Sequence, residues 1–389
     1  MNLLRDGNSL KMGWLQLSHG RSRMIVALLG VAVAVLLMLT VLSLKQAVYT
    51  SSLLVPSSLR GDLIVLSSRT QSFSRPARLS VRLVARLTGI AGVASASTIS
   101  TDMGKWINPW THQEHPIRVW GLDLQAGVLG LPGIDPDNPV LRKADAVLFD
   151  ELARPKFGPI ATELHAGHEV YAEVNGRRIA VVGLTRAGVS IGIDGNLFTT
   201  EANYQRLFPG QTPSACHVGV VRLEPGTDLP AVLNAAQTLL GREAIVMPRS
   251  EVLVAETAYM KANEPVDAIM TTIAAVAFAV GMIIVYQILY ADVINHLTQF
   301  ATMKAIGFSN GYLMRIVMSE GLILSLIGFW PGLLAAIALT ASAQAVIMLP
   351  IKVTIGRAVL VFTLTVVMCA IAAAAAVRKL AKADPANVF

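Results

Sequence analysis

Residues 24–44 read MIVALLGVAVAVLLMLTVLSL, which is an apolar run of 21 residues without a charged side chain. A bilayer core about 30 Å thick is crossed by roughly 20 residues of α-helix. We expect a helix here, because backbone N–H and C=O groups in lipid must bond within their own segment. The run exceeds the apolar stretch of a signal peptide, roughly 7–15 residues, so we interpret it as a retained membrane anchor.

Three further apolar runs, at 266–291, 316–349 and 358–377, are also long enough to cross a bilayer. The chain is 53% hydrophobic and 15% charged, whereas a soluble domain carries about 25% charged residues. Pro331 and Gly332 lie at the middle of the third run. Proline removes a helix hydrogen bond, so we expect a kink there. The sequence therefore predicts four transmembrane helices.

Lys and Arg residues in short loops predict which side of the membrane each segment faces. Nine of them lie in the N-terminal segment 1–23, the loop at 292–315 and the tail at 378–389, against two in the loop at 350–357. Both termini and the 292–315 loop are therefore predicted to be cytoplasmic. The N-terminal segment has an amphipathic pattern suited to lying at the membrane surface.

The polar segment at 45–265 separates the first helix from the second, and we predict that it forms an external α+β domain. Residues 61–66 have the composition of a buried strand, and Asn175-Gly176 is typical of a hairpin turn. Residues 102–145, which are rich in Pro, Gly and Trp, are expected to form a loop or a boundary between two lobes. Helical stalks are expected at both ends of the domain.

The charge of this segment bears on its partners. From Lys45 to Asp267 there are 21 basic and 21 acidic residues, so the chain's net charge of +7 lies in the segments that flank the apolar runs. A nucleic-acid-binding domain would carry a basic patch of its own. We therefore expect membrane lipid, and not nucleic acid, to be the partner of the basic residues.

Three short patterns resemble catalytic or metal-binding motifs. Residues 188–192 read GVSIG, which matches the G-x-S-x-G elbow of serine hydrolases, but no helix pattern follows it. Two H-x-x-H pairs, at 112–115 and 165–168, lie beside Pro116 and Gly167, which disfavour a helical face for metal ligands. We interpret all three as loops, so no metal is expected. An anchored hydrolase using Ser190 stays an alternative. The sequence contains no phosphate-binding P-loop.

Glu320 is an acidic residue well inside a predicted span. An ionisable residue in a membrane suggests a functional role by default. Because Glu320 lies about one turn from the predicted start of the third helix and near Arg315, we favour snorkelling or local pairing over a role in proton or substrate handling.

The loop at 292–315 carries the most informative pattern. Residues 295–308 read NHLTQFATMKAIGF, a short helical pattern that ends at a glycine. A short helix held between two membrane helices can transmit force from a cytoplasmic partner. The residues predicted to form this coupling helix are Gln299, Phe300, Ala301, Thr302, Met303, Lys304, Ile306, Gly307 and Phe308.

This segment resembles the coupling helix of FtsX/MacB-type permeases of ABC transporters, and the chain as a whole is most similar to their DevC-type members. The resemblance extends over IVYQILYADV (284–293), EGLIL (320–324), GFWPG (328–332), ADPANVF (383–389) and, in the external domain, FDELARPKFGPI (149–160). One departure is Gln299, where the wider family commonly has an acid.

The resemblance implies a non-catalytic permease subunit in the inner membrane of a bacterial cell. It implies a homodimer that works with a separate cytoplasmic ATPase carrying ATP and Mg, a periplasmic adaptor of the membrane-fusion type and a TolC-like outer-membrane channel. ATP-driven motion of the cytoplasmic helices would then move the external domains and export a lipid-like or other substrate. An FtsX-like regulator of a cell-wall hydrolase is the alternative that the same resemblance leaves open.

Overall fold

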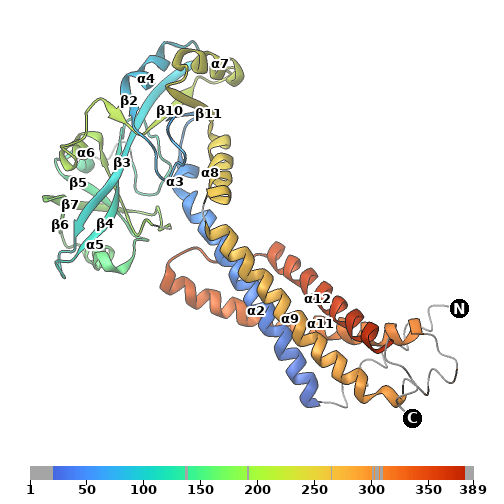
Figure 1. The fold of residues 1–389 in the computed structure, drawn as a ribbon. Coiled ribbons are helices and arrows are strands. Elements are labelled where there is room, and N and C mark those ends of the chain that lie inside the picture. Colours follow the sequence, from blue (N-terminus) through green and yellow to red (C-terminus); the bar gives the residue numbers. More distant parts are fainter. Residues whose placement is uncertain are drawn as a thin grey trace. The chain divides into compact units, whose positions relative to one another are not determined.

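The computed structural model describes residues 21–135, 139–190, 192–263, 265–299, 302, 306 and 310–381. The described residues divide between two compact units. One, which we call the membrane unit, falls within 1–46, 265–346 and 351–389, and the other, the sheet unit, within 47–264 and 347–350. Figure 1 shows the helices of the first unit and the mixed helices and strands of the second.

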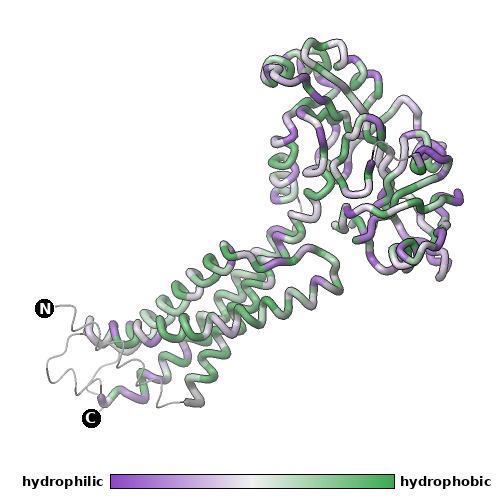
Figure 2. Tube along the Cα trace, turned by 180° about the vertical axis from the view of Figure 1, so that it is seen from behind, coloured by the Kyte–Doolittle hydropathy of each residue, from purple (hydrophilic) through white to green (hydrophobic). Residues whose placement is uncertain are grey.

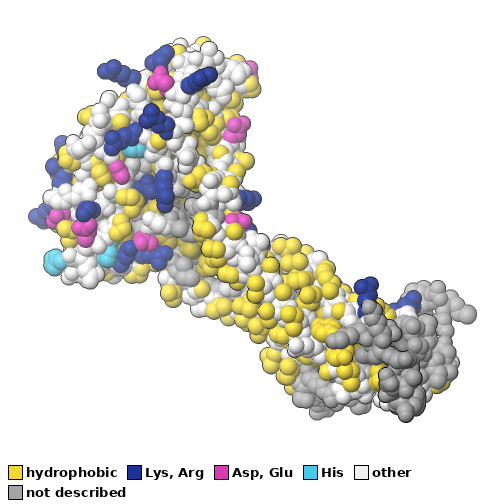
Figure 3. All heavy atoms as spheres, viewed as in Figure 1, with side chains coloured by type: hydrophobic (Ala, Val, Ile, Leu, Met, Phe, Trp, Pro, Cys, Tyr) yellow, Lys and Arg dark blue, Asp and Glu magenta, His cyan; other side chains and the backbone are white. Residues whose placement is uncertain are grey.

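The membrane unit is built from long apolar helices. Among the described residues, four helices are long and apolar enough to cross a membrane. They are α2 (Arg21–Ser52), α9 (Pro265–Asn295), α11 (Asn310–Ile347) and α12 (Ile355–Ala381). Figure 2 shows that hydrophobic residues dominate these helices, and on the face drawn in Figure 3 hydrophobic side chains cover them almost continuously.

The sheet unit is a mixed sheet with short helices around it. Within the described residues, nine strands form one sheet in the order β11-β1-β10-β3-β4-β8-β5-β7-β6. Their bounds are β1 Leu63–Ser67, β3 Val93–Ile107, β4 Glu114–Leu122, β5 Ala146–Asp150, β6 Val170–Val174, β7 Arg177–Thr185, β8 Asn196–Thr200, β10 Val218–Leu223 and β11 Ala244–Pro248. The predicted fold class, four transmembrane helices with an inserted α+β domain, is confirmed.

The long strand β3 belongs to both halves of this sheet. Its first half pairs with β10 and extends a four-stranded antiparallel sheet. Its last residues pair with β6, Trp106 opposite Val174, so that β3, β4, β8, β5, β7 and β6 close into a ring. Trp106, Phe149 and Phe157 are buried among the side chains of this ring.

Short helices and a small second sheet complete the unit. The helices are α3 (Leu54–Ser58), α4 (Val81–Arg86), α5 (Ile160–His165), α6 (Glu201–Leu207), α7 (Leu229–Leu240) and α8 (Arg249–Asn263), with 3₁₀ turns at Leu87–Gly89, Pro139–Arg142 and Pro155–Phe157. Strands β2 (Leu79–Ser80) and β9 (Ala215–Cys216) pair with each other. Side chains of α4 and α7 share one buried apolar cluster with β1 and β11.

The region at 102–145 corrects the sequence analysis. It was expected to be a loop or a lobe boundary, but β3 runs on to Ile107 and β4 occupies Glu114–Leu122. The two strands pair over nine positions. Pairing with neighbouring strands and the burial of β4, whose last six residues are all buried, outweigh the local Pro and Gly content. The hairpin at Asn175-Gly176 is confirmed, with the positive φ angles of 51° and 78° that its turn requires.

Candidate functional site

Much of the predicted coupling helix lies outside the described residues, namely Phe300, Ala301, Met303, Lys304, Gly307 and Phe308. Gln299, Thr302 and Ile306 are described, and all three are exposed. The Thr302 hydroxyl donates to the Thr298 carbonyl at 2.8 Å, and the Ile306 N–H donates to the Thr302 carbonyl at 3.1 Å. This spacing of four residues is that of an α-helix. The coupling role of the segment stays a prediction.

Glycines bring the helices of the membrane unit close to α2. A Cβ added at Gly332 of α11 would lie 2.6 Å from the carbonyl oxygen of Ala32 and 2.7 Å from the Cβ of Val35. At Gly328, one turn earlier, an added Cβ would lie 2.8 Å from Val31. Small residues that let backbones approach are the usual basis of helix packing in lipid. The contact between α2 and α11 therefore depends on these two glycines.

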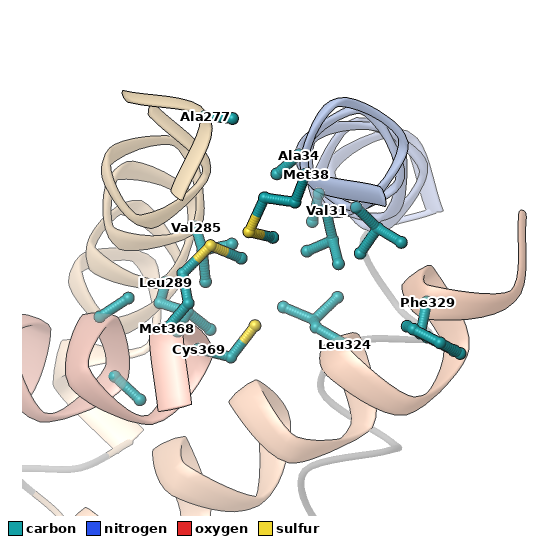
Figure 4. Close-up of a cluster of buried hydrophobic side chains, with 14 of the residues drawn as sticks. Val31, Ala34, Met38, Ala277, Val285, Leu289, Leu324, Phe329, Met368 and Cys369 are labelled. Atoms are coloured by element: carbon teal, nitrogen blue, oxygen red, sulfur yellow. The ribbon is translucent and has the colours of Figure 1, made fainter. Parts of the chain in front are cut away.

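Two more glycines connect the remaining helices. Gly281 of α9 faces Ala34 of α2 and Met368 of α12, with an added Cβ only 2.6 and 2.7 Å from their atoms. Gly321 of α11 faces the backbone carbonyl of Cys369 in α12. Figure 4 shows side chains from all four helices meeting in one interior. Sequence reasoning missed these contacts, because a glycine in an apolar run does not reveal its partner.

The predicted kink site is thus also a packing site. Pro331 lies inside α11, which continues through it as one helix, and its side chain is exposed while Gly332 is buried. The structure gives no angle for a bend at this point, so the kink stays a prediction. The close approach of Gly332 to α2 is a second role for the same motif.

Glu320 lies deeper than expected. The third helix begins at Asn310, six residues before the predicted start at 316, so Glu320 is about three turns into α11. Its side chain is 1% exposed, and neither carboxylate oxygen accepts a hydrogen bond from the part of the chain that the structure describes. The expectation of a snorkelling side chain is therefore wrong. A functional role for Glu320 stays a prediction.

An ion pair joins α2 to α9 near one end of the bundle. The Lys45 Nζ lies 2.7 Å from Asp267 Oδ1 and donates to the Thr271 hydroxyl at 2.9 Å. Both charged side chains are about three-quarters buried. A partly buried pair is screened less by salt than an exposed one. The contact therefore links the first helix to the first turns of the second.

Of the residues considered for catalysis or metal binding, Ser190, His112 and His168 lie in loops or turns, whereas His115 lies in β4 and His165 ends α5. Ser190 forms a tight turn with Ile193 through hydrogen bonds of 2.9 and 3.2 Å, and strand β8, not a helix, follows at Asn196. A nucleophile elbow needs a strand, a sharp turn and a helix. His112 lies in the β3–β4 turn, and the His168 ring contacts Glu163 at 2.7 Å.

A buried aspartate organises the loop that contains Ser190. Asp150, at the end of β5, is fully buried and accepts hydrogen bonds from the N–H groups of Leu152, Ala187 and Gly188 and from the Asn196 amide, at 2.9–3.2 Å. Burial raises the pKa of Asp150, and the hydrogen bonds act in the opposite direction. The carboxylate therefore fixes the loop between β7 and β8.

A second buried group, His217, contacts the middle of β3. Its Nδ1 accepts the Thr101 N–H at 3.1 Å, so its Nε2 carries the proton in the neutral ring. Burial lowers the pKa of His217, while the nearby Asp102 raises it and Arg78 and Arg118 lower it further. The structure therefore requires the neutral imidazole.

Comparison with known proteins assigns the C-terminal part of the chain. Residues 271–385 match the family described as the FtsX-like permease C-terminal domain. This stretch contains most of α9, all of α11 and α12, and the loop at 292–315. No curated protein shows significant sequence similarity to the chain.

Three solved structures are similar to about half of the chain. The periplasmic region of MacB from Actinobacillus actinomycetemcomitans is 13% identical with a TM-score of 0.38, over 50% of this chain and 92% of that one. The extracellular domain of the noncanonical ABC-type transporter YknZ from Gram-positive bacteria is 15% identical with a TM-score of 0.33, over 48% and 98%. A domain of a permease protein from Porphyromonas gingivalis is 14% identical with a TM-score of 0.32, over 50% and 91%.

Proposed function

Because residues 271–385 carry an FtsX-like permease C-terminal domain, we propose that the chain is the permease subunit of an ABC exporter. In this proposal a separate cytoplasmic ATPase binds and hydrolyses ATP with its Mg²⁺, and the present chain has no catalytic role. The observation that carries the proposal is the position of the match, which covers three of the apolar helices and the loop with the predicted coupling helix.

The packing of the membrane unit supports a role in passing on motion. Glycine contacts at Gly281, Gly321, Gly328 and Gly332 leave little space between the helices. Close-packed interiors transmit displacement because they cannot be compressed locally. A push on the 292–315 loop would therefore move α9 and α11 together with α2 and α12.

The finer parts of the proposal come from the sequence resemblance alone. They are a homodimer in the bacterial inner membrane, a periplasmic adaptor, a TolC-like outer-membrane channel and a lipid-like or other exported substrate. The orientation comes instead from the Lys and Arg residues in the short loops, by which both termini would be cytoplasmic and the sheet unit periplasmic. The motion of the cytoplasmic helices would change the conformation of the sheet unit and so drive export.

The test uses the full chain purified with its ATPase. We expect the chain alone to hydrolyse no ATP and the complex to hydrolyse it at a rate that depends on the permease. F300D or M303D should abolish that dependence, because a charge would replace the apolar residues at the predicted contact. I355D is the matched control, since Ile355 lies at the start of α12, within the segment 350–357 that is predicted to be external, and is 85% exposed.

Two results would contradict the proposal. Normal permease-dependent hydrolysis by F300D and M303D would show that the 292–315 loop is not the ATPase contact. Co-purification of a cell-wall hydrolase with the sheet unit, in place of an adaptor, would favour an FtsX-like regulator over an exporter.

A further inference from the structure

Helix α8 carries a buried acid in an otherwise apolar stripe. Val252, Glu256 and Met260 are the buried residues of α8, and they recur every four residues along one face. The Glu256 side chain is 3% exposed. In the part of the chain that the structure describes, no Lys, Arg or His lies within ion-pair distance of it. A buried carboxylate without such a partner must be stabilised by hydrogen bonds.

Those hydrogen bonds come from one four-residue turn. The Oε1 of Glu256 accepts from the hydroxyls of Ser72 and Ser74 at 2.8 and 2.9 Å and from the Ser74 N–H at 3.3 Å. Its Oε2 accepts from the Phe73 N–H at 2.6 Å. The turn is itself closed by a hydrogen bond from the Arg75 N–H to the Ser72 carbonyl. Four donors thus converge on a single side chain.

The same turn is also bound to a strand of the sheet. The guanidinium of Arg118, in the middle of β4, donates to the Ser74 carbonyl at 3.0 Å. Arg118 is 8% exposed, and its backbone N–H donates to the Gly195 carbonyl at 3.0 Å. A buried carboxylate and a buried guanidinium therefore bind the same turn, the carboxylate through N–H and hydroxyl groups and the guanidinium through a carbonyl oxygen. Hydrogen bonds to charged groups of this kind are stronger than neutral ones.

A charge is not needed here for stability alone. Replacing a buried ionic group by an apolar one of similar size is often neutral or stabilising. The buried charge fixes the position of α8 along the turn at 72–75, because a shift of the helix by one turn would leave four donors and a carboxylate without partners. The first residue of α8 is held as well, since the Arg249 guanidinium donates to the Leu59 carbonyl at 2.7 Å. The helix therefore cannot slide along the sheet unit.

The position of α8 in the chain gives this contact a function. Only Glu264, which lies outside the described residues, separates the end of α8 at Asn263 from the start of α9 at Pro265. We propose that Glu256, the turn at 72–75 and Arg118 form a clasp through which displacement of α8 reaches strand β4. Glu256 is a positioning residue in this clasp. The inference rests on the proposed function, in which the ATPase-driven motion of the membrane helices supplies the displacement of α8.

The clasp is tested first without nucleotide, by hydrogen–deuterium exchange of the full chain. The Phe73 and Ser74 amides should exchange slowly in the natural protein and about tenfold or more faster in E256Q, because the amide keeps only one acceptor oxygen. E251Q is the matched control, since Glu251 lies on the exposed face of the same helix. Unchanged exchange of the turn in E256Q would overturn the clasp. Should E256Q fail to fold, the double variant S72A/S74A removes two donors, and a smaller increase is expected.

The second arm adds the ATPase and a non-hydrolysable ATP analogue. Nucleotide should change exchange in the 72–75 turn and in β4 of the natural protein and of E251Q. It should leave both segments unaffected in E256Q, while ATP hydrolysis by the complex continues. An equal nucleotide response in E256Q would overturn the proposed transmission. If the natural chain binds no ATPase, both the proposed exporter function and the proposed transmission through α8 are contradicted. The exchange experiment without nucleotide then still decides whether the clasp holds α8.

Discussion

The close approach of Gly332 to the backbone of α2 makes a quantitative prediction for G332A. A Cβ at this position would lie 2.6 Å from the backbone oxygen of Ala32 and 2.7 Å from the Cβ of Val35, so α2 or α11 must shift. Overpacking of this kind costs about 1–3 kcal/mol. Replacing Gly by Ala inside a helix returns up to about 1 kcal/mol. Because the atoms met are a backbone oxygen and a branched Cβ, which cannot rotate away, the upper part of that cost, about 2–3 kcal/mol, applies. We therefore expect a net loss of about 1–2 kcal/mol in the free energy of unfolding.

The protein contains its own reporter for this measurement. Its two cysteines, Cys216 and Cys369, are both buried, and Cys369 lies in the interior of the bundle. In a C216A background, a maleimide dye that fluoresces on reaction with thiols reports opening of the membrane unit alone. A loss of about 1–2 kcal/mol should lower the unfolding temperature by about 2–8 °C, on a scale of about 2–4 °C per kcal/mol for 150–250 residues.

The control is the same substitution in an open place. Around Gly356, in the first turn of α12, no atom lies within 4 Å of an added Cβ. G356A should therefore leave the unfolding temperature unchanged or raise it. If G332A unfolds at the same temperature as G356A, the close approach of α11 to α2 is wrong, and with it the rigid bundle that the proposed function requires.

Three further predictions concern polar groups. K45D should lower the unfolding temperature of the membrane unit. The swapped pair K45D/D267K should recover part of that loss, with a coupling energy of about 1 kcal/mol for a partly buried ion pair. If the double variant recovers nothing, the ion pair is not formed. Because burial lowers the pKa of His217, its contribution to stability is complete above about pH 6.5 and is lost as the pH falls below that value. Thermal unfolding, followed through Cys216 in a C369A background, should therefore show a smaller loss of stability between pH 7.5 and 5.5 in H217Q than in the natural protein. An equal loss in both would exclude His217 as a cause. D150N places an amide where three backbone N–H groups converge and should speed exchange at the Ala187 and Gly188 amides about tenfold or more; slow exchange there would contradict the assigned hydrogen bonds.

The membrane helices could be predicted from the sequence, because long apolar runs are sufficient to identify them. The expected spans differ from the helices mainly at their ends, because a helix continues beyond lipid wherever its backbone can. Residues 310–315 are too polar for an apolar window yet form the first turns of α11. That shift moves Glu320 from the expected surface position into the interior. A hydropathy pattern gives the lipid-crossing part of a helix but not its ends.

The sheet unit was less predictable, and for different reasons. Residues 102–122 contain Pro and Gly but form two long strands, because pairing with neighbours decides strand formation more than local propensity does. The burial of Glu256 could have been predicted, because Val252, Glu256 and Met260 follow one another at intervals of four residues and so lie on one buried helix face. Its partner turn at 72–75 could not, because it is more than 180 residues away in the sequence.

The central claim is that the 292–315 loop meets a separate ATPase. It is tested most directly by crosslinking from I306C, because Ile306 is 73% exposed and the two natural cysteines are buried. A photoactivatable thiol reagent at this position should capture a nucleotide-binding ATPase subunit, while the same reagent at I355C should not. Capture of the ATPase from I355C and not from I306C would contradict the account.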